Sequence, residues 1–376
     1  MKLLVISHTE HVKFQGKIYG LGSTVRELNN LCGRFSEITH LAPCTGEVEK
    51  VPLNYVGYTS NIKYEMIPSY GGKTILGKLT VILRMPEIIW SVFRALKQND
   101  YFQFRAPTAM GLYIIPMLTY CYPNKTGWYK YAGNWIQETP PLSYLIQKKI
   151  LLLCNHRKVT INGNWPDKTD ILVPFENPCL TIDEFNKGKI VRAAKDYSNL
   201  QGCFIGRLDS SKGFEEVLRS HASLVRLNIK LVHVVGEGIE QDSYKEIAKN
   251  LSKEVEYIFY GALSPARVHE VLIHSHCLFL PSKSEGFPKV VSEGLNYGVI
   301  PFVSDVSCIS QYINDSNGYL IKDDLSTTLE TVMENTIGFQ HNIDESDLYK
   351  FTYEYYSNRI CNEILTNDSP EITCKS

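Results

Sequence analysis

The sequence predicts an α/β protein built from two Rossmann-like domains. Short runs of strand length alternate with segments of helical periodicity, and the runs are apolar almost throughout, as in parallel strands buried on both faces. The chain has 376 residues, enough for two such domains. We expect an N-terminal domain over residues 1–178 and a C-terminal domain over residues 179–351, which face each other across a cleft. A helix over about residues 352–370 is expected to pack back on the N-terminal domain.

The C-terminal half shows this alternation most clearly. Its predicted strands cover residues 203–206, 229–236, 255–261, 277–281 and 299–304, and its predicted helices cover residues 213–227, 240–251, 264–275 and 288–297. Ser264 is a preferred N-cap residue type, and Pro265 suits the first helical position that follows it. This half is therefore expected to form one parallel sheet covered by helices.

The N-terminal half repeats the theme less regularly. Its predicted strands cover residues 2–7, 36–43, 101–107, 127–133, 158–163 and 171–174. Its predicted helices cover residues 74–97, with a break near Pro86, 108–119 and 142–154. Residues 16–31 are expected to be a glycine-containing loop that runs into a helix capped by Ser23. Residues 177–199 contain two patches rich in Pro, Asn and Gly and are expected to be the linker.

Composition excludes several classes of protein. The net charge of −1 gives no overall basic field for nucleic acid. The ten cysteines form no CxxC pair, so a zinc ribbon or a redox motif is disfavoured, and buried thiols in the reducing cytoplasm are expected. The apolar run at the N-terminus has only five residues, too short for a signal peptide, and no segment approaches the ~20 apolar residues of a membrane span.

The first candidate site is the loop "GRLDSSKG", residues 206–213. Ligands of open parallel sheets bind outside the carboxyl ends of the strands, and this loop follows a predicted strand. Arg207 and Lys212 place two cations there, next to the start of a helix, which favours an anion such as a phosphate. The loop matches neither GxxxxGK[ST] nor GxGxxG, so a Walker loop or a dinucleotide fingerprint is not indicated.

The second candidate site is "PSKSEGFPKVVSEGLNYGVIPFVSD", residues 281–305. Glu285 lies in a loop and Glu293 in the helix that follows, where Pro288 is expected in the first turn. The exposed backbone N–H groups near Gly286 would face sugar hydroxyls or phosphate. A carboxylate is the natural acceptor for the hydroxyls of a ribose, which Glu293 could reach.

These motifs, in this order, resemble those of the family 4 retaining glycosyltransferases of the GT-B fold. The resemblance is specific over residues 200–322, and the phrases "YKYAGNW", "TINGNWP" and "FENPCL" are similar to members of bacterial surface-polysaccharide clusters. It implies a nucleotide sugar held by the C-terminal domain and an acceptor held by the N-terminal domain. It also implies that Arg207 and Lys212 hold the donor diphosphate, that Glu285 holds the transferred sugar, and that Glu293 holds the ribose.

The resemblance thus gives three groups of candidate residues. The catalytic residues would be Glu285, Arg207 and Lys212. The donor-binding residues would be Gly206, Arg207, Lys212, Gly236, Leu263, Glu285, Gly286, Phe287, Pro288 and Glu293. The acceptor or diphosphate loop would contain Gly20, Gly22 and Asn134, although the loop "IYGLGS" matches the family's glycine loop only loosely. Many members have a histidine near the position of Asn134, and this chain has none there; His8 and His11 are other candidates.

The expected function is the retaining transfer of a hexose or related sugar from a UDP- or GDP-sugar to a glycan or lipid-linked acceptor, in the synthesis of capsule or O-antigen. No DxD motif stands in a convincing loop, and Asp323-Asp324 is expected to be a turn, so we expect neither a metal nor another cofactor. Two alternatives stay open. The chain could be an inactive scaffold or a glycan-binding protein, or it could be a sugar-nucleotide epimerase of the same fold.

Two segments could contact a membrane. Residues 73–97 and 145–158 combine basic residues with dense apolar runs, the composition of a helix that lies on an anionic bilayer. A core-facing helix with a basic exterior would show the same composition. The expected location is therefore the cytoplasm, with possible peripheral contact at the inner face of the cytoplasmic membrane.

Overall fold

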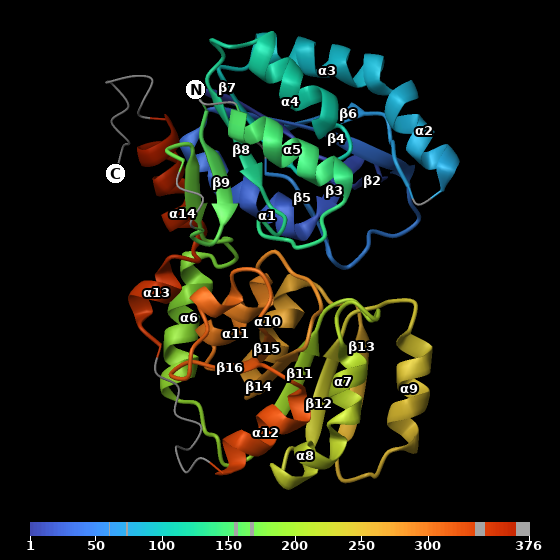
Figure 1. Ribbon diagram of the computed structural model, residues 1–376, viewed down its shortest axis with the longest axis vertical. Coiled ribbons are helices and arrows are strands. Elements are labelled where there is room, and N and C mark those ends of the chain that lie inside the picture. The colour runs from blue at the N-terminus through green and yellow to red at the C-terminus, as the bar shows by residue number, and fades with distance from the viewer. Residues whose placement is uncertain (60, 73, 154–156, 166–168, 335–342, 366–376) are drawn as a thin grey trace. The chain divides into compact units, whose positions relative to one another are not determined.

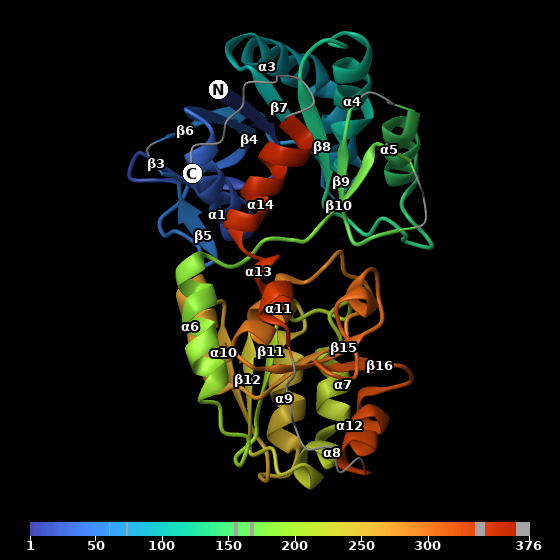
Figure 2. The same cartoon turned by 90° about the vertical axis from the view of Figure 1, so that its left-hand side faces the viewer.

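The chain forms two compact α/β units (Figures 1 and 2). The computed structural model describes residues 1–59, 61–72, 74–153, 157–165, 169–334 and 343–365. Unit 1 comprises Met1–Glu176 together with the C-terminal segment that starts at Tyr353, and unit 2 comprises Asn177–Thr352. The predicted fold class, α/β with two parallel sheets, is confirmed.

Unit 1 is built on a ten-stranded sheet. Its strands are β1 (Lys2–Ile6), β2 (His11–Phe14), β3 (Lys17–Leu21), β4 (Glu37–Glu47), β5 (Tyr55–Gly57), β6 (Ile62–Ile67), β7 (Tyr101–Ala106), β8 (Gly127–Tyr131), β9 (Val159–Asn162) and β10 (Leu172–Phe175). Its helices are α1 (Gly22–Leu31), α2 (Ile75–Leu83), α3 (Met85–Gln98), α4 (Gly111–Tyr120), α5 (Leu142–Leu153) and α14 (Tyr353–Arg359), with a 3₁₀ turn at Cys32–Arg34 and a π-helical turn at Ile360–Leu365. The strand order is β10-β9-β8-β7-β1-β4-β2-β3-β5, with β6 paired to β4.

The apolar strands of unit 1 feed two separate cores, one on each face of the sheet. Successive side chains of a strand point to opposite faces. In β1, Leu4 and Ile6 join the core beneath α3, α4 and α5, while Leu3 and Val5 join the core beneath α1 and α14. The continuous apolar run that predicted a strand buried on both faces is explained by this arrangement.

The C-terminal segment completes the second core of unit 1. Tyr356 of α14 packs edge-on against Phe175 of β10, with ring centroids 5.6 Å apart, and both side chains are buried. Arg359 pairs with Glu176 at 3.0 Å and lies over the Phe175 ring. Residues 366–370 of the predicted terminal helix lie outside the described part of the chain.

The predicted glycine loop before α1 is wrong, because residues 17–21 are strand β3. This strand pairs antiparallel with β2 across a tight turn, where Gln15 and Gly16 have φ of 48° and 74°. A Cβ on Gly20 would overlap the ring of His11, so close packing requires a glycine there. Helix α1 begins directly at Gly22, with no side-chain cap at its start, so the predicted capping role of Ser23 is also wrong.

Unit 2 is built on a six-stranded parallel sheet. Its strands are β11 (Gln201–Ile205), β12 (Leu231–Val235), β13 (Glu256–Gly261), β14 (Cys277–Leu280), β15 (Ile300–Ser304) and β16 (Tyr319–Ile321). Its helices are α6 (Ile182–Ala193), α7 (Phe214–Arg219), α8 (His221–Arg226), α9 (Gln241–Asn250), α10 (Pro265–His274), α11 (Lys289–Asn296), α12 (Leu325–Glu334) and α13 (Glu345–Tyr349), with a 3₁₀ turn at Ile309–Gln311.

The strand order of unit 2, β13-β12-β11-β14-β15-β16, places a topological switch point between β11 and β14. From this point the chain winds outward in both directions, so the loops after β11 and β14 diverge. Open α/β sheets bind ligands in the crevice at such a point, outside the carboxyl ends of the strands. The two candidate motifs of the sequence follow these two strands.

Two expectations for unit 2 are wrong. Residues 177–199 are not a plain linker, because they contain the twelve-residue helix α6, which starts with a capping box between Thr181 and Glu184. The helix expected over residues 213–227 is divided at Ser220 into α7 and α8. The Ser220 hydroxyl donates to the carbonyl of Glu216 at 2.9 Å, and such back-bonding bends helices.

Two further expectations concern membrane-spanning helices and the cysteines. No helix among the described residues is both long enough and apolar enough to cross a bilayer. Eight cysteines lie in the described ranges, and six of them are buried. Burial raises the pKa of the Cys203 thiol to about 12, so this group is inert in the sheet.

A buried chain of hydrogen bonds fixes the protonation of two histidines in unit 1. The carbonyl of Pro43 accepts from His11 Nδ1 at 3.1 Å, so His11 Nε2 carries no proton and accepts from the Tyr58 hydroxyl at 2.5 Å. The Tyr58 oxygen then accepts from His40 Nδ1 at 2.6 Å, and His40 Nε2 accepts from the Ser7 hydroxyl at 2.7 Å. Both rings are therefore neutral, and burial lowers the pKa of His11 to about 4 and that of His40 well below its usual value.

Unit 1 should lose stability in mild acid. The folded pKa of His11 lies below its unfolded value of 6.5, so the unfolded chain binds protons first. The stabilising contribution is complete above pH 6.5 and is lost as the pH falls toward 4. At pH 5 the loss from His11 alone is about 2 kcal/mol in the free energy of unfolding. All four tryptophans, Trp90, Trp128, Trp135 and Trp165, lie in unit 1, so tryptophan fluorescence during urea unfolding measures this unit.

The matched control is the His11→Gln variant. It should unfold at lower urea concentration than the wild type at pH 7, but its stability should fall less steeply between pH 7 and pH 5. Equal slopes for the variant and the wild type would show that His11 does not titrate in this range.

Candidate functional site

The two candidate motifs meet at the switch point of unit 2 through an ion pair. Lys212 Nζ, from the loop after β11, lies 2.5 Å from Glu285 Oε1, from the loop after β14. Both side chains are largely shielded, with exposed fractions of 18% and 11%. The sequence predicted both residues at this edge of the sheet, and the structure places a cation and a carboxylate within one hydrogen bond of each other.

Arg207 provides a second cation on the same loop, with 72% of its side chain exposed. Its Nη2 lies 3.2 Å from Asp209 Oδ2. Hydrogen bonds from Ser211 lower the pKa of Asp209, so this carboxylate stays charged and holds the guanidinium above the loop. Arg207 therefore keeps most of its hydrogen-bonding capacity directed to solvent.

Backbone contacts hold the loops after β11 and β12 together. The N–H of Gly206 donates to the backbone carbonyl of Val235 at 3.0 Å, and the N–H of Leu208 donates to the backbone carbonyl of Glu237 at 3.0 Å. A Cβ on Gly236, whose φ is 131°, would overlap the carbonyl oxygen of Gly206. The sequence predicted Gly206 and Gly236 as donor-binding residues, and the structure shows that Gly236 is also required for the close approach of these loops.

Gly213 has the same role between the loops after β11 and β14. Its φ is 77°, and an added Cβ would overlap the carbonyl oxygen of Pro281. In addition, the N–H of Lys283 donates to the carbonyl of Ser211 at 2.9 Å. The loops after β11, β12 and β14 therefore form one backbone-linked structure.

The segment from Gly286 to Pro288 is anchored from behind by aromatic packing. Phe287 is buried and stacks on Phe351 with ring centroids 5.4 Å apart, and it also contacts Tyr312. Its carbonyl accepts a hydrogen bond from the Asn177 side chain at 3.1 Å. Pro288 is the N-cap residue of α11, one position earlier than the sequence predicted. Phe287 therefore acts as an anchor, while the neighbouring Gly286 and Pro288 stay half-buried at the surface.

Glu293 lies inside α11 beside a buried histidine. Its Oε1 lies 4.0 Å from His269 Nε2, and Oε1 of Glu184 lies 3.7 Å from the same atom. His269 Nδ1 is hydrogen-bonded to the Tyr297 hydroxyl at 2.8 Å, which fixes the plane of the ring. The Glu293 side chain is 12% exposed, so a small part of it is accessible.

Leu263, the predicted residue farthest from the switch point, follows β13 and is half-buried. The loop after β13, which contains Leu263, is tied to the loop after β12, because the N–H of Ala262 donates to Glu237 Oε1 at 3.3 Å. All ten predicted donor-binding residues thus lie in unit 2, on the loops after β11 to β14 and on α11.

The three predicted acceptor-side residues lie in unit 1 and have local structural roles. Gly20 is buried in β3, and the N–H of Gly22 donates to the carbonyl of Asn54 at 2.8 Å. The Asn134 side-chain oxygen accepts from the N–H of Ile136 at 3.0 Å in the loop after β8. His8 is exposed at the end of β1, whereas His11 is buried and fully used by the hydrogen bonds described above.

Sequence analysis missed a buried charged cluster in unit 1. Both carboxylate oxygens of Glu27 on α1 lie 2.7 Å from Lys130 Nζ on β8, and Oε1 lies 2.9 Å from Arg105 on β7. The Lys130 ammonium also lies 4.6 Å from the ring centroid of Tyr356. The sequence carried one signal of this cluster, namely the charged residues Arg105 and Lys130 within largely apolar strands.

Among the described residues, no group of three or more His, Cys, Asp or Glu is arranged to hold a metal ion.

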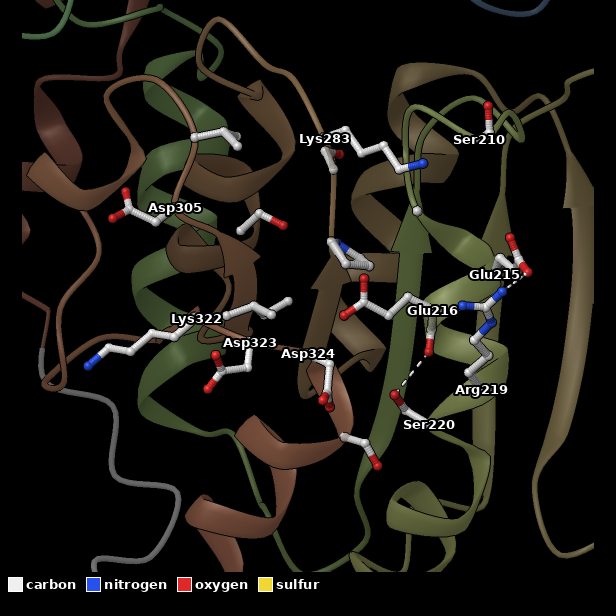
Figure 3. Close-up of a pocket in the computed structure, with 17 residues that line it drawn as sticks. Ser210, Glu215, Glu216, Arg219, Ser220, Lys283, Asp305, Lys322, Asp323 and Asp324 are labelled. Atoms are coloured by element: carbon white, nitrogen blue, oxygen red, sulfur yellow. Dashed lines mark hydrogen bonds and ion pairs between the residues drawn. The ribbon is translucent and has the colours of Figure 1, made fainter. Parts of the chain in front are cut away.

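A cavity of about 910 Å³ adjoins the loop that leads to Glu285 (Figure 3). It lies between α7, α12 and the carboxyl ends of β14 to β16, and none of the predicted donor-binding residues lines it. Figure 3 shows Glu215 and Arg219 paired on α7, at one side of the cavity. Burial raises the pKa of Glu216 on the same helix, with a further contribution from Asp324. No sequence motif pointed to this cavity.

Comparison with known proteins identifies the domain and the fold. Residues 192–346 match the family model described as "Glycosyl transferases group 1". An uncharacterized 41.2 kDa protein in the cps region of Klebsiella pneumoniae is 23% identical over 171 residues. That match covers 45% of this chain and 44% of the relative, so less than half of either protein is compared.

Solved structures resemble the chain over nearly its whole length. The lipopolysaccharide outer core galactosyltransferase WaaB, in its apo form, has a TM-score of 0.64 at 18% identity, covering 98% of this chain and 100% of WaaB. HepE of Anabaena in complex with UDP has a TM-score of 0.61 at 13% identity, covering 96% and 95%. Sucrose-phosphate synthase of Thermosynechococcus elongatus has a TM-score of 0.67 at 13% identity, covering 96% and 97%. At these identities the likeness establishes the fold.

Replacing Gly236 or Gly206 by alanine should change the stability of unit 2 by different amounts. Gly236→Ala adds a Cβ at a φ of 131° and against the Gly206 carbonyl, so it should lower the stability of unit 2 by about 2–5 kcal/mol. Gly206→Ala is the matched control, because its Cβ would meet its nearest neighbour at an ordinary 3.6 Å. Differential scanning calorimetry measures both midpoints. Equal midpoints for the two variants would contradict the close packing of the loops.

Proposed function

We propose that this chain, a group 1 glycosyl transferase with the GT-B fold, transfers a sugar from a nucleoside-diphosphate sugar to a glycan or lipid-linked acceptor with retention of anomeric configuration. The observation that carries the proposal is the Lys212–Glu285 ion pair at the switch point of unit 2, with Arg207 exposed on the same loop. A switch point lined by two cations and a carboxylate suits a ligand that is a diphosphate at one end and a polyol at the other.

Bond cleavage at the anomeric carbon leaves negative charge on the diphosphate. Arg207 and Lys212 would stabilise this charge, because fixed cations in a partly shielded site favour a state in which charge develops. Arg207 is the more accessible of the two, while Lys212 must share its ammonium between Glu285 and the phosphate. The same two cations supply what a metal ion would otherwise provide, so we propose that the reaction needs no metal.

Glu285 would hold the transferred sugar. A carboxylate accepts hydrogen bonds from hydroxyl groups, and Lys212 orients Glu285 from one side, which leaves its remaining lone pairs for the sugar. The backbone beside it is rigid, because Phe287 is buried between aromatic rings. Glu293, on helix α11, would accept hydrogen bonds from the ribose hydroxyls.

Several findings support the choice of substrates and location. HepE, a structural relative, was solved with UDP and with UDP-glucose, which supports a UDP-sugar and a hexosyl group as the first choice of donor. The cps-region relative and the galactosyltransferase WaaB support an acceptor in surface polysaccharide synthesis. The burial of most cysteines in the described ranges suits a reducing compartment, which supports action in the cytoplasm.

A nucleoside diphosphate should stabilise the purified protein in the presence of EDTA. Among UDP, GDP, ADP and CMP, one should raise the unfolding midpoint of unit 2, because at a hundred times its Kd it adds about 2.7 kcal/mol to the free energy of unfolding. Arg207→Ala and Lys212→Ala should lose this stabilisation, because each removes a cation from the phosphate. Arg207→Ala is the cleaner variant, since the exposed side chain contributes little to folding. Calorimetry with and without each nucleotide measures the effect.

The matched control is Arg219→Ala, which removes an exposed arginine of unit 2 that pairs with Glu215 at the surface. It should keep the full nucleotide response. If no nucleotide stabilises the well-folded wild type, the chain is better described as an inactive scaffold. If EDTA abolishes a response that magnesium restores, the metal-independent mechanism is wrong.

Transfer itself should depend on Glu285. Glu285→Ala removes the acceptor for the sugar hydroxyls, so it should lower kcat by at least about a hundredfold while the nucleoside diphosphate still binds. Product formation from a radiolabelled nucleotide sugar and a membrane extract measures this loss. Wild-type turnover in Glu285→Ala would remove this residue from the site, and exchange of the sugar for its epimer without transfer would indicate an epimerase.

A further inference from the structure

Helix α2 of unit 1 exposes its apolar face to solvent, whereas a surface helix of a globular domain turns that face to the core. Its large apolar residues are Ile75, Leu76, Leu79, Ile82 and Leu83, with exposed fractions of 79%, 77%, 48%, 66% and 75%. They follow the spacing i, i+1, i+4, i+7, i+8, which places all five on one face. None of the residues of α2 is buried.

The inner face of α2 consists of the half-buried Gly77, Thr80 and Val81, which are small or medium-sized. The Thr80 hydroxyl accepts from the N–H of Gly71 at 2.9 Å and donates to the carbonyl of Gly77 at 2.6 Å. A Cβ on Gly77 would meet the carbonyl oxygen of Gly71 at 2.8 Å, so the loop before the helix packs directly on this face. The side chain of Thr74 caps the helix by accepting from the N–H of Gly77 at 3.0 Å. The helix is therefore fixed with its apolar face outward.

The apolar surface continues onto α3. Trp90 is 64% exposed and stacks on Phe93, with ring centroids 5.5 Å apart. These two residues line an apolar groove of about 860 Å³ between α3 and the end of α4, together with Met85, Pro86, Ile89, Met117, Cys121 and Tyr122. An exposed apolar surface of this extent marks an interaction site.

The charges around this surface are mainly positive. Residues 74–98 contain four basic residues, Lys78, Arg84, Arg94 and Lys97, all of them exposed, and one acidic residue, Glu87. The chain as a whole has a net charge of −1, so positive charge is concentrated here. An apolar helix face with a tryptophan and flanking cations complements an anionic bilayer, into which the apolar side chains insert while the cations remain among the headgroups.

The second basic segment of the sequence is less suited to this role. Helix α5 exposes Leu142, Leu145, Ile146 and Leu153, but the arginine that follows it is not at the surface. Arg157 is 5% exposed and donates to the carbonyls of Leu118 and Lys125, so it closes the end of α4. Residues 154–156 of this segment lie outside the described part of the chain.

We propose that α2 and the first half of α3 form a docking surface for an anionic lipid bilayer, with Leu76, Leu79 and Ile82 in the acyl-chain region. The surface is independent of any nucleotide site in unit 2. Its role would be to hold unit 1 at the membrane, where a lipid-linked acceptor is found.

The test uses vesicles without any nucleotide. The wild-type chain should sediment with vesicles that contain phosphatidylglycerol, and less with pure phosphatidylcholine vesicles or at high salt. Trp90 is a native probe, because Trp128 and Trp135 are buried and Trp165 is half-buried. Its fluorescence should shift to the blue on binding and be quenched by brominated lipid chains, and Trp90→Phe should remove most of this signal.

The diagnostic variant is the double substitution Leu76→Gln with Ile82→Gln. It should weaken vesicle binding by at least tenfold, because inserting one apolar side chain is worth about that factor or more. The matched control is Ile190→Gln with Ile239→Gln, which changes two isoleucines of unit 2 that are 72% and 92% exposed and should leave binding unchanged. Thermal midpoints check that each variant folds, and the wild-type quenching result stands without them.

Three results would overturn the proposal. The wild type could fail to bind anionic vesicles. Binding could persist in the Leu76→Gln, Ile82→Gln variant and be lost instead in Leu145→Gln with Ile146→Gln, which would assign the contact to α5. Sedimentation equilibrium could show a wild-type dimer that the first variant dissociates, without vesicle binding, in which case a second copy of the chain covers this surface.

Discussion

The candidate site depends on the close backbone contacts between the loops at the carboxyl edge of unit 2. Gly236 passes the carbonyl of Gly206 at a distance that excludes any side chain, and Gly213 passes the carbonyl of Pro281 in the same way. These contacts fix the positions of loops that carry Arg207, Lys212 and Glu285. A binding site needs its groups held in place before the ligand arrives, and here the sheet and three linked loops provide that rigidity.

Within this frame, Lys212 and Glu285 restrain each other. Removing either partner of a shielded ion pair leaves an unpaired charge, which costs about 3–5 kcal/mol in fully buried pairs. The pair keeps some exposure, so the cost here is smaller, and both groups can still reach a ligand. A phosphate that approaches Lys212 would replace part of the attraction of Glu285 and leave this carboxylate available to sugar hydroxyls. The same contact that links the two loops therefore couples the two halves of the proposed substrate.

The sequence predicted the parallel strands well because their signal is local. Runs such as "LLVI" and "CLFL" are apolar at every position, and strands buried on both faces require this. The hairpin β2–β3 was missed because Gly20 suggested a loop, whereas it is needed for packing against His11. Helix α6 was missed because its sequence is polar and only Gly188 is buried, so no apolar periodicity marks it.

The site was predicted in the same uneven way. Motif spacing placed the donor-side residues on loops that the sheet brings together, but it gave no contact between Lys212 and Glu285, which are 73 residues apart. The cluster of Glu27, Arg105 and Lys130 joins residues 78 and 103 positions apart, and only the folded sheet brings them together. For residues 73–97 the sequence left membrane contact and core packing both open, because a helical pattern does not reveal which face is buried.

The return of α14 to unit 1 has a consequence for synthesis on the ribosome. Tyr356, Ile360 and Ile364 belong to the same core as Leu3 and Val5 of β1, so the first and last elements of the described residues pack together. All of unit 2 is translated before α14 emerges. Domains of a nascent chain usually mature in the order in which they are made. Here the N-terminal unit must wait for its final core residues while the C-terminal unit, contiguous in sequence, is already complete. Unit 1 is thus begun first and completed last. Until α14 is made, its sheet exposes apolar side chains of the kind that chaperones bind.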